Sequence, residues 1–276
     1  MIANQQNILQ PLNPGDSFTL AMDEEIRKEG MPGSIGGFAL ELSKKPDIVK
    51  LEKRIEEFTQ RFPVSLASLQ QFGRRFYWRR RDSPPTVFFR QECPVVEDEE
   101  LFQKKAIDQI FNLVEPREKT APVEFHLLEG RKKNTFIMRW IHPFCDARGA
   151  DLILKYLCTE DEKQRKLFGV PETEPLVNQQ LKKFSWWKKI SLFLKAKKYI
   201  EQLDRLQSIL PYQGSQSPQR LQYSIQRLTT EQTQVITQQI RKHVGLTGTS
   251  LYYIGCLMRA LEKINPEQES EAYCVP

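Results

Sequence analysis

Bulky apolar residues occupy every second position between residues 135 and 141, which is the spacing of a β-strand with one face more buried than the other. Pro143 ends this strand, because the residue before a proline is pushed away from helical backbone angles. His142 is therefore expected at the tip of the strand, followed by a turn that runs to Gly149. After the turn, four apolar residues with helical spacing predict a helix: Leu152, Ile153, Tyr156 and Leu157. The imidazole thus lies where a strand meets a helix, a common place for an active site.

The same two periodicities predict further elements. Strands are expected at residues 37–42, 122–128, 221–227 and 272–276. Helices are expected at residues 46–60, 186–210, 229–244 and 249–264. Thr229 can cap the helix that follows it, with Gln232 completing a capping box. Residues 1 to about 20 are interpreted as a loose lead-in. Residues 74–81 are interpreted as an edge strand protected by arginines, and since they have no companion motif of an RNA-binding fold, nucleic acid is not favoured as a partner.

His142 and Asp146 are the candidate chemical residues. A neutral imidazole can take a proton from a hydroxyl, amine or thiol near physiological pH, and a carboxylate four residues later can orient the ring or hold the turn. A buried structural histidine followed by a turn-capping aspartate would give the same pattern. Cys145 lies between the two, but neighbouring side chains on a turn point apart, so a small packed thiol is favoured over a nucleophile. His126, on the preceding strand, is interpreted as structural or surface-exposed.

Around His142 and Asp146 the chain resembles the chloramphenicol-acetyltransferase-like superfamily, which includes condensation domains of nonribosomal peptide synthetases and wax ester synthases. The resemblance extends to the early strand, the first long helix and the Arg61–Pro63 turn that follows it. In relatives a doubled histidine precedes the aspartate, and the second histidine is the catalytic base. That histidine corresponds to His142, and the largely structural aspartate corresponds to Asp146. The first histidine is replaced here by Ile141.

The resemblance implies an α/β fold of the α+β two-layer sandwich type, with a mixed sheet and flanking helices. It also implies an acyltransferase that moves an acyl group from a thioester, on coenzyme A or a carrier protein, to a hydroxyl or amine of a small molecule or lipid. His142 would be its general base, and no metal or bound cofactor is implied. The rival interpretation is a non-catalytic remnant or interaction module that binds a carrier protein or a membrane surface.

Members of this superfamily have two similar lobes, and the chain has 276 residues. The sequence therefore predicts an N-terminal lobe at residues 1–158, a basic amphipathic bridge at 159–218 and a partial second lobe at 219–276. Such a truncated domain could be inactive by itself. The residues that stabilise an oxyanion, and those that hold the donor, are not identified by the pattern.

Composition is that of a globular α/β protein, with 39% hydrophobic and 28% charged residues. The N-terminus lacks the pattern of a secretory signal, and no apolar run approaches the length of a spanning helix. Five scattered cysteines argue against a disulfide scaffold or a zinc site. A cytoplasmic location is therefore expected, with reduced cysteines.

Positive charge is concentrated at residues 176–200, which contain seven lysines and no acidic residue. Trp186 and Trp187 begin the predicted basic helix, and Lys188 and Lys189 follow them. Such a helix can lie on an anionic membrane surface, or dock an acidic carrier protein or the phosphates of coenzyme A. It can also pack its apolar stripe on the lobe and leave the lysines to solvent, which is what most amphipathic helices do.

Overall fold

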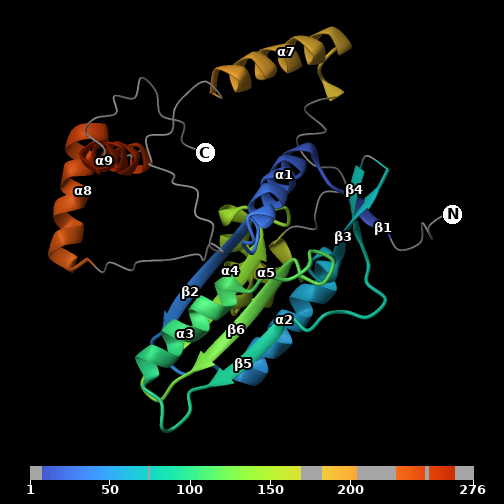
Figure 1. Cartoon of the computed structure of the whole chain (residues 1–276). Coiled ribbons are helices and arrows are strands. Elements are labelled where there is room, and N and C mark those ends of the chain that lie inside the picture. Colours follow the sequence, from blue (N-terminus) through green and yellow to red (C-terminus); the bar gives the residue numbers. More distant parts are fainter. Residues whose placement is uncertain (1–7, 74, 169–181, 204–227, 246–248, 265–276) are drawn as a thin grey trace. The chain divides into compact units, whose positions relative to one another are not determined.

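A computed structural model describes residues 8–73, 75–168, 182–203, 228–245 and 249–264 (Figure 1). The described residues divide into two compact units. Residues up to 168 belong to the first unit, and those from 182 onward belong to the second.

A four-stranded mixed sheet forms the centre of the first unit, in the order β2-β7-β6-β5. Its strands are β2 (Ile35–Leu42), β5 (Phe88–Glu92), β6 (Val123–Glu129) and β7 (Asn134–Ile141). β7 is antiparallel to both β2 and β6, whereas β5 runs parallel to β6. The strands predicted at residues 37–42, 122–128 and 135–141 are confirmed, and so is the mixed sheet.

Helices cover both faces of this sheet. The helices of the first unit are α1 (Pro14–Lys28), α2 (Ile48–Arg61), α3 (Glu99–Asn112), α4 (Ala147–Cys158) and α5 (Glu162–Leu167), and the short 3-10 helix η2 spans Pro63–Leu66. α2 and α4 pack on one face through Phe58 and Tyr156, and α3 packs on the other through Ile110 (Figure 1). Consequently all eight residues of β7 are buried. The expectation of one more exposed face was wrong, because each face of the strand has its own helical cover.

A second sheet of three strands has the order β1-β4-β3, with β1 (Ile8–Pro11), β3 (Ser68–Phe72) and β4 (Arg75–Arg79). β4 is the central strand and not an edge strand, because β1 pairs with the side that β3 leaves open. The interpretation of residues 74–81 as an edge was therefore wrong.

Residues 8–20, which were expected to belong to a loose lead-in, contain β1 and the first part of α1, so the expectation was wrong for these residues. α1 begins at Pro14, and the side chain of Asn13 caps it by accepting a hydrogen bond from the Asp16 N–H. An asparagine cap followed by proline is a strong start signal for a helix. Leu20 of this helix is buried against Trp78 and Ile141, which fixes α1 beside the end of β7.

The second unit contains α7 (Trp186–Leu203), α8 (Thr230–Val244) and α9 (Thr249–Ile264). The capping box of Thr229 and Gln232 is confirmed, and so is the helix at 249–264. The basic helix is confirmed as far as Leu203, while its expected remainder and the strands expected at 221–227 and 272–276 lie outside the described residues. None of the described helices combines the length and the apolar character needed to cross a membrane.

Candidate active site

The backbone of His142 continues the pairing of β7 with β2. Ile141 is the last residue of the ladder and lies opposite Ile35. Beyond it, the His142 N–H donates to the Ser34 carbonyl at 2.9 Å, and the Phe144 N–H donates to the Ile141 carbonyl at 2.9 Å. The second bond closes the turn. These two hydrogen bonds fix the backbone of His142 at the end of a central strand, and its imidazole is half-buried.

A buried carboxylate of α1 stabilises the backbone segment to which His142 is hydrogen-bonded. Asp23 is 2% exposed and accepts a hydrogen bond at 2.7 Å from the N–H of Ser34, the residue whose carbonyl holds His142. Arg27 and Arg117 pair with the other carboxylate oxygen of Asp23. Gly33 allows this approach, since a Cβ there would lie 2.1 Å from Asp23 Oδ1 and its φ is +98°. Hydrogen bonds through the backbone of Ser34 thus link Asp23, in α1, to His142 at the end of β7.

No described residue forms a hydrogen bond with the imidazole of His142. Nδ1 of His142 is buried and has no hydrogen-bond partner among the described residues. In many proteins such a bond sets which ring nitrogen carries the proton.

Asp146 caps the helix that follows. Its Oδ1 accepts a hydrogen bond from the Gly149 N–H at 2.8 Å, at the first turn of α4. The side chain is exposed and points its oxygen at the helix, so its observed role is to hold the turn. No residue of this turn has a positive φ. Gly149 instead permits close packing, because a Cβ there would lie 2.8 Å from Cβ of Cys145.

Asp16 is the residue that the sequence interpretation missed. It lies in the first turn of α1, half-buried, and the Asn13 side chain donates a hydrogen bond to its carboxylate. Burial raises the pKa of Asp16 to about 6, and the charge of Asp146 adds to the rise, while Asn13 and the charge of His142 oppose it. The charges of His142 and Asp146 therefore both act on the carboxyl group of Asp16. The only sequence signal was the Asn13–Pro14 helix start, which says nothing of His142.

The raised pKa of Asp16 gives a pH-dependent stability. The folded protein holds this proton up to about pH 6, whereas an unfolded aspartate with a pKa near 3.8 releases it earlier. Between these values the folded state binds more protons, so this group lowers the free energy of unfolding as pH rises. We expect Asp16→Asn to remove that decrease. Urea unfolding from pH 4 to about pH 7 should show the wild-type and variant curves separating with rising pH, with the variant the more stable at the upper end. Parallel curves would contradict the raised pKa.

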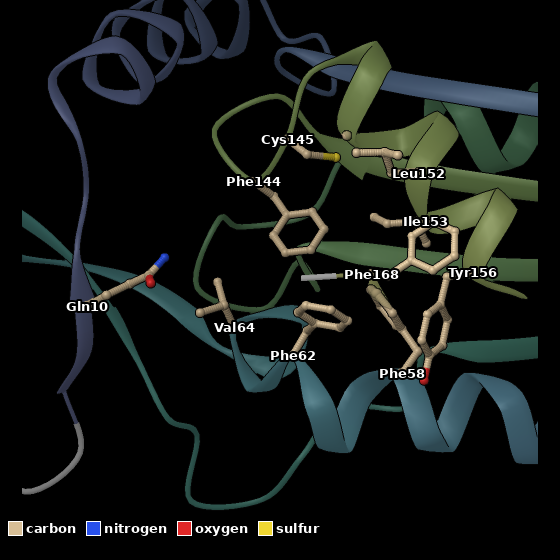
Figure 2. Close-up of a pocket in the computed structure, with 11 residues that line it drawn as sticks. Gln10, Phe58, Phe62, Val64, Phe144, Cys145, Leu152, Ile153, Tyr156 and Phe168 are labelled. Atoms are coloured by element: carbon tan, nitrogen blue, oxygen red, sulfur yellow. The ribbon is translucent and has the colours of Figure 1, made fainter. Parts of the chain in front are cut away.

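An apolar pocket of about 320 Å³ opens beside the turn (Figure 2). Phe144 and Cys145 enter it from the turn itself. Figure 2 shows the aromatic ring of Phe62, just past the end of α2, and that of Tyr156, in α4, facing the pocket. The full lining is Gln10, Phe58, Phe62, Val64, Phe144, Cys145, Gly149, Leu152, Ile153, Tyr156 and Phe168. His142 and Asp16 are not among these residues. The pocket therefore adjoins the site through the turn and does not contain the imidazole.

Cys145 is a packed thiol, as the sequence suggested. Burial raises its pKa to about 12, and the negative charges of Asp146 and Asp16 contribute. The thiol is neutral at physiological pH and is unsuited to attack a carbonyl.

A buried ionic cluster lies on the face of the sheet that α3 covers. Glu124 and Arg139 are cross-strand partners, and Arg139 donates to Glu124 Oε2 at 2.9 Å and to the Leu113 carbonyl at 3.2 Å. Burial alone would raise the pKa of Glu124, but the neighbouring His126 and Arg139 outweigh it and lower the pKa. Nε2 of His126 is 3.5 Å from that carboxylate, and its ring stacks on Phe89. The structural role expected for His126 fits this burial.

The remaining expected contact residues are elsewhere. Trp186, Trp187, Lys188 and Lys189 begin α7 in the second unit and are exposed. Within the described part of the chain, no group of three or more histidine, cysteine or acidic residues could hold a metal ion.

No protein-family model matches the sequence, and no curated protein matches it. Among solved structures, the chain is similar to the starter condensation domain of rhizomide synthetase RzmA, with 11% identity and a TM-score of 0.46 over 53% of this chain and 35% of that one. The same domain in complex with C8-CoA and Leu-SNAC matches with 9% identity and a TM-score of 0.48, over 54% of this chain and 34% of that one. The tallysomycin biosynthesis protein TlmII matches with 14% identity and a TM-score of 0.46, over 54% of this chain and 35% of that one. The chain thus spans about a third of the length of these structures.

Proposed function

We propose that the chain is an acyltransferase-like protein in which His142 is the general base. The donor would be an acyl thioester on coenzyme A or a carrier protein, and the acceptor would be a hydroxyl or amine. The observation that carries the proposal is His142 itself, held by its backbone at the end of β7 with a side-chain nitrogen that has no partner. We expect this chemistry to take place in the cytoplasm, with no metal or redox cofactor.

The proposed reaction has two proton transfers. Because Nδ1 is buried, Nε2 of His142 takes the proton of the acceptor O–H or N–H as its oxygen or nitrogen attacks the thioester carbonyl. The tetrahedral intermediate then collapses, the C–S bond breaks, and the thiolate leaves with the proton that His142 holds. An ionised Asp16 favours the imidazolium formed between the two steps, since opposite charges stabilise each other.

The pocket suits the acyl part of such a donor. Its volume lies at the lower end of the range of about 300–1,000 Å³ typical of ligand sites, and its lining is almost wholly apolar and aromatic. A short or medium acyl chain could enter it beside Phe144, with the thioester towards the turn. A starter condensation domain with C8-CoA and Leu-SNAC bound illustrates the same classes of donor and acceptor. We propose a medium-chain thioester and an amine as the first pair to test.

Narrowing the pocket should change the preferred chain length. Leu152 lines it and is 52% exposed, so a larger side chain can be placed there without rebuilding the core. We expect Leu152→Trp to lower kcat/KM for an octanoyl thioester by roughly tenfold, because about two methylenes lose their burial at ~0.8 kcal/mol each. The value for an acetyl thioester should stay close to that of the wild type.

Val49→Trp is the matched control for this test. Val49 is 77% exposed on α2 and does not line the pocket. Its substitution should leave kcat/KM for both thioesters unchanged. An equal loss for the octanoyl and acetyl donors in Leu152→Trp would place the acyl chain elsewhere.

A further inference from the structure

The first turns of α7 expose an unusual amount of aromatic surface. Trp186 is 64% exposed, Trp187 is 73% exposed, Phe193 is 68% exposed and Leu194 is 58% exposed. The two tryptophan rings contact each other, with centroids 4.6 Å apart. Scattered single apolar residues need no explanation on a protein surface, but a contiguous group of this kind marks an interaction site.

These residues share one side of the helix. At 100° per residue, Trp186, Ile190 and Phe193 project within one narrow sector, and Trp187 and Leu194 adjoin it. Lys188 and Lys195 project from the opposite side. Over residues 186–195 the helix therefore separates an aromatic side from a basic side, whereas Lys197 and Glu201, further along α7, project from the aromatic side and pair with each other.

The charge of the segment has one sign. Residues 182–198 contain only lysines among their charged residues, and all of them are exposed: Lys182, Lys183, Lys188, Lys189, Lys195, Lys197 and Lys198. The first acidic residue after this segment is Glu201, near the end of α7, which pairs with Lys197 at 3.7 Å. A surface that covers this helix must accept aromatic rings and supply negative charge.

We propose that α7 binds the surface of an anionic membrane, with its aromatic side in the boundary between headgroups and acyl chains. A helix that lies on a membrane combines lysines on the polar side with tryptophan, phenylalanine and leucine on the other. Tryptophan is enriched at the depth of the headgroups, and anionic lipids attract clustered lysines. An acidic protein surface would match the lysines, but it would not need two adjacent exposed tryptophans. The proposal does not depend on His142 or on acyl transfer.

The tryptophans themselves supply the readout. The sequence has four, and Trp78 and Trp140 are buried at 2% and 4% exposure, so a change in emission reports on Trp186 and Trp187. The whole chain would be mixed with vesicles of phosphatidylcholine, either alone or with phosphatidylserine. We expect a blue shift and flotation with the anionic vesicles only, and both should weaken at high salt.

Two charge-reversed variants locate the contact. Lys188→Glu/Lys195→Glu should weaken partition into anionic vesicles by at least about tenfold, because the attraction to the surface is replaced by repulsion. Lys44→Glu/Lys53→Glu makes the same change in net charge at exposed positions of the first unit and should bind like the wild type. Circular dichroism would establish that both variants keep their helices.

Each other outcome overturns the proposal. Failure of the wild type to float with either vesicle would do so, as would equal flotation with both. Equal weakening in the two variants would mean that net charge alone drives binding. A blue shift with polyglutamate but not with vesicles would replace the membrane by an acidic protein partner. Emission that is already blue and resists iodide quenching without vesicles would show that the chain covers its own tryptophans.

Discussion

Replacing Arg139 by methionine should lower the free energy of unfolding by about 3–5 kcal/mol, the usual effect of removing one member of a buried ion pair. Arg139 is 2% exposed and Glu124 is 6% exposed, so the carboxylate would stay in the core without solvent and without the guanidinium that hydrogen-bonds to it. The carbonyl of Leu113 would lose its donor as well. Urea unfolding at neutral pH measures the loss.

Two further variants separate the charge effect from packing. Glu124→Gln/Arg139→Met should recover part of the lost stability, because no ionised group is then left buried. Lys155→Met breaks a pair with Asp151 whose side chains are 60% and 53% exposed, and it should change stability by less than about 1 kcal/mol. A loss of similar size in Arg139→Met and Lys155→Met would show that the buried pair contributes little.

The pH dependence follows from the lowered pKa of Glu124. A carboxylate whose folded pKa is depressed stabilises the fold above its unfolded pKa, and this stability disappears as pH falls through the folded value. In Arg139→Met only burial and His126 would act on Glu124, so it would protonate at a higher pH. The difference in stability between wild type and variant should therefore shrink as pH is lowered through the acid range.

Local patterns were sufficient to place β7, α2, α4 and α9, because strands and helices repeat their apolar residues at different periods. They did not give the position of β4, since a strand becomes central or edge only when its neighbours are known. Here the second neighbour is β1, a four-residue strand too short to have a recognisable period. For the same reason the sequence did not predict that helices pack on both faces of β7.

The candidate site was only half accessible to sequence reasoning. His142 and Asp146 belong to one short motif, and the capping geometry of Asp146 follows from its place before α4. Asp16 lies more than a hundred residues before His142 in the sequence, and only the packing of α1 against the end of β7 brings its charge near the imidazole. The Glu124–Arg139 pair likewise requires the register of β6 on β7.

Replacing His142 by alanine should reduce the rate of acyl transfer by about 10²- to 10⁴-fold, the usual contribution of a positioned general base. The effect should fall on kcat, because the proton moves only in the reaction itself. The substitution removes no side-chain hydrogen bond of the described residues, so the variant should fold and unfold like the wild type. A loss of activity accompanied by a large loss of stability would point to a structural histidine.

Asp146→Asn is the matched variant within the motif. Asparagine caps helices as well as aspartate does, so the turn and α4 should keep their stability. If Asp146 acts through the cap, this variant should retain most of the activity. A loss comparable to that of His142→Ala would instead assign the carboxylate charge a direct effect on the imidazole.

The central claim is that His142 takes the proton of the acceptor, and quantifying the acylated acceptor by mass spectrometry tests it. Wild type, His142→Ala and His243→Ala would each be incubated with an octanoyl thioester and an amine acceptor. His243 is an exposed residue in the last turn of α8 and controls for the loss of any imidazole. Wild type and His243→Ala should form the product at the same rate, at least about 10² times faster than His142→Ala. Equal, background amounts of product from all three proteins would contradict the acyltransferase assignment and leave a module whose function is binding.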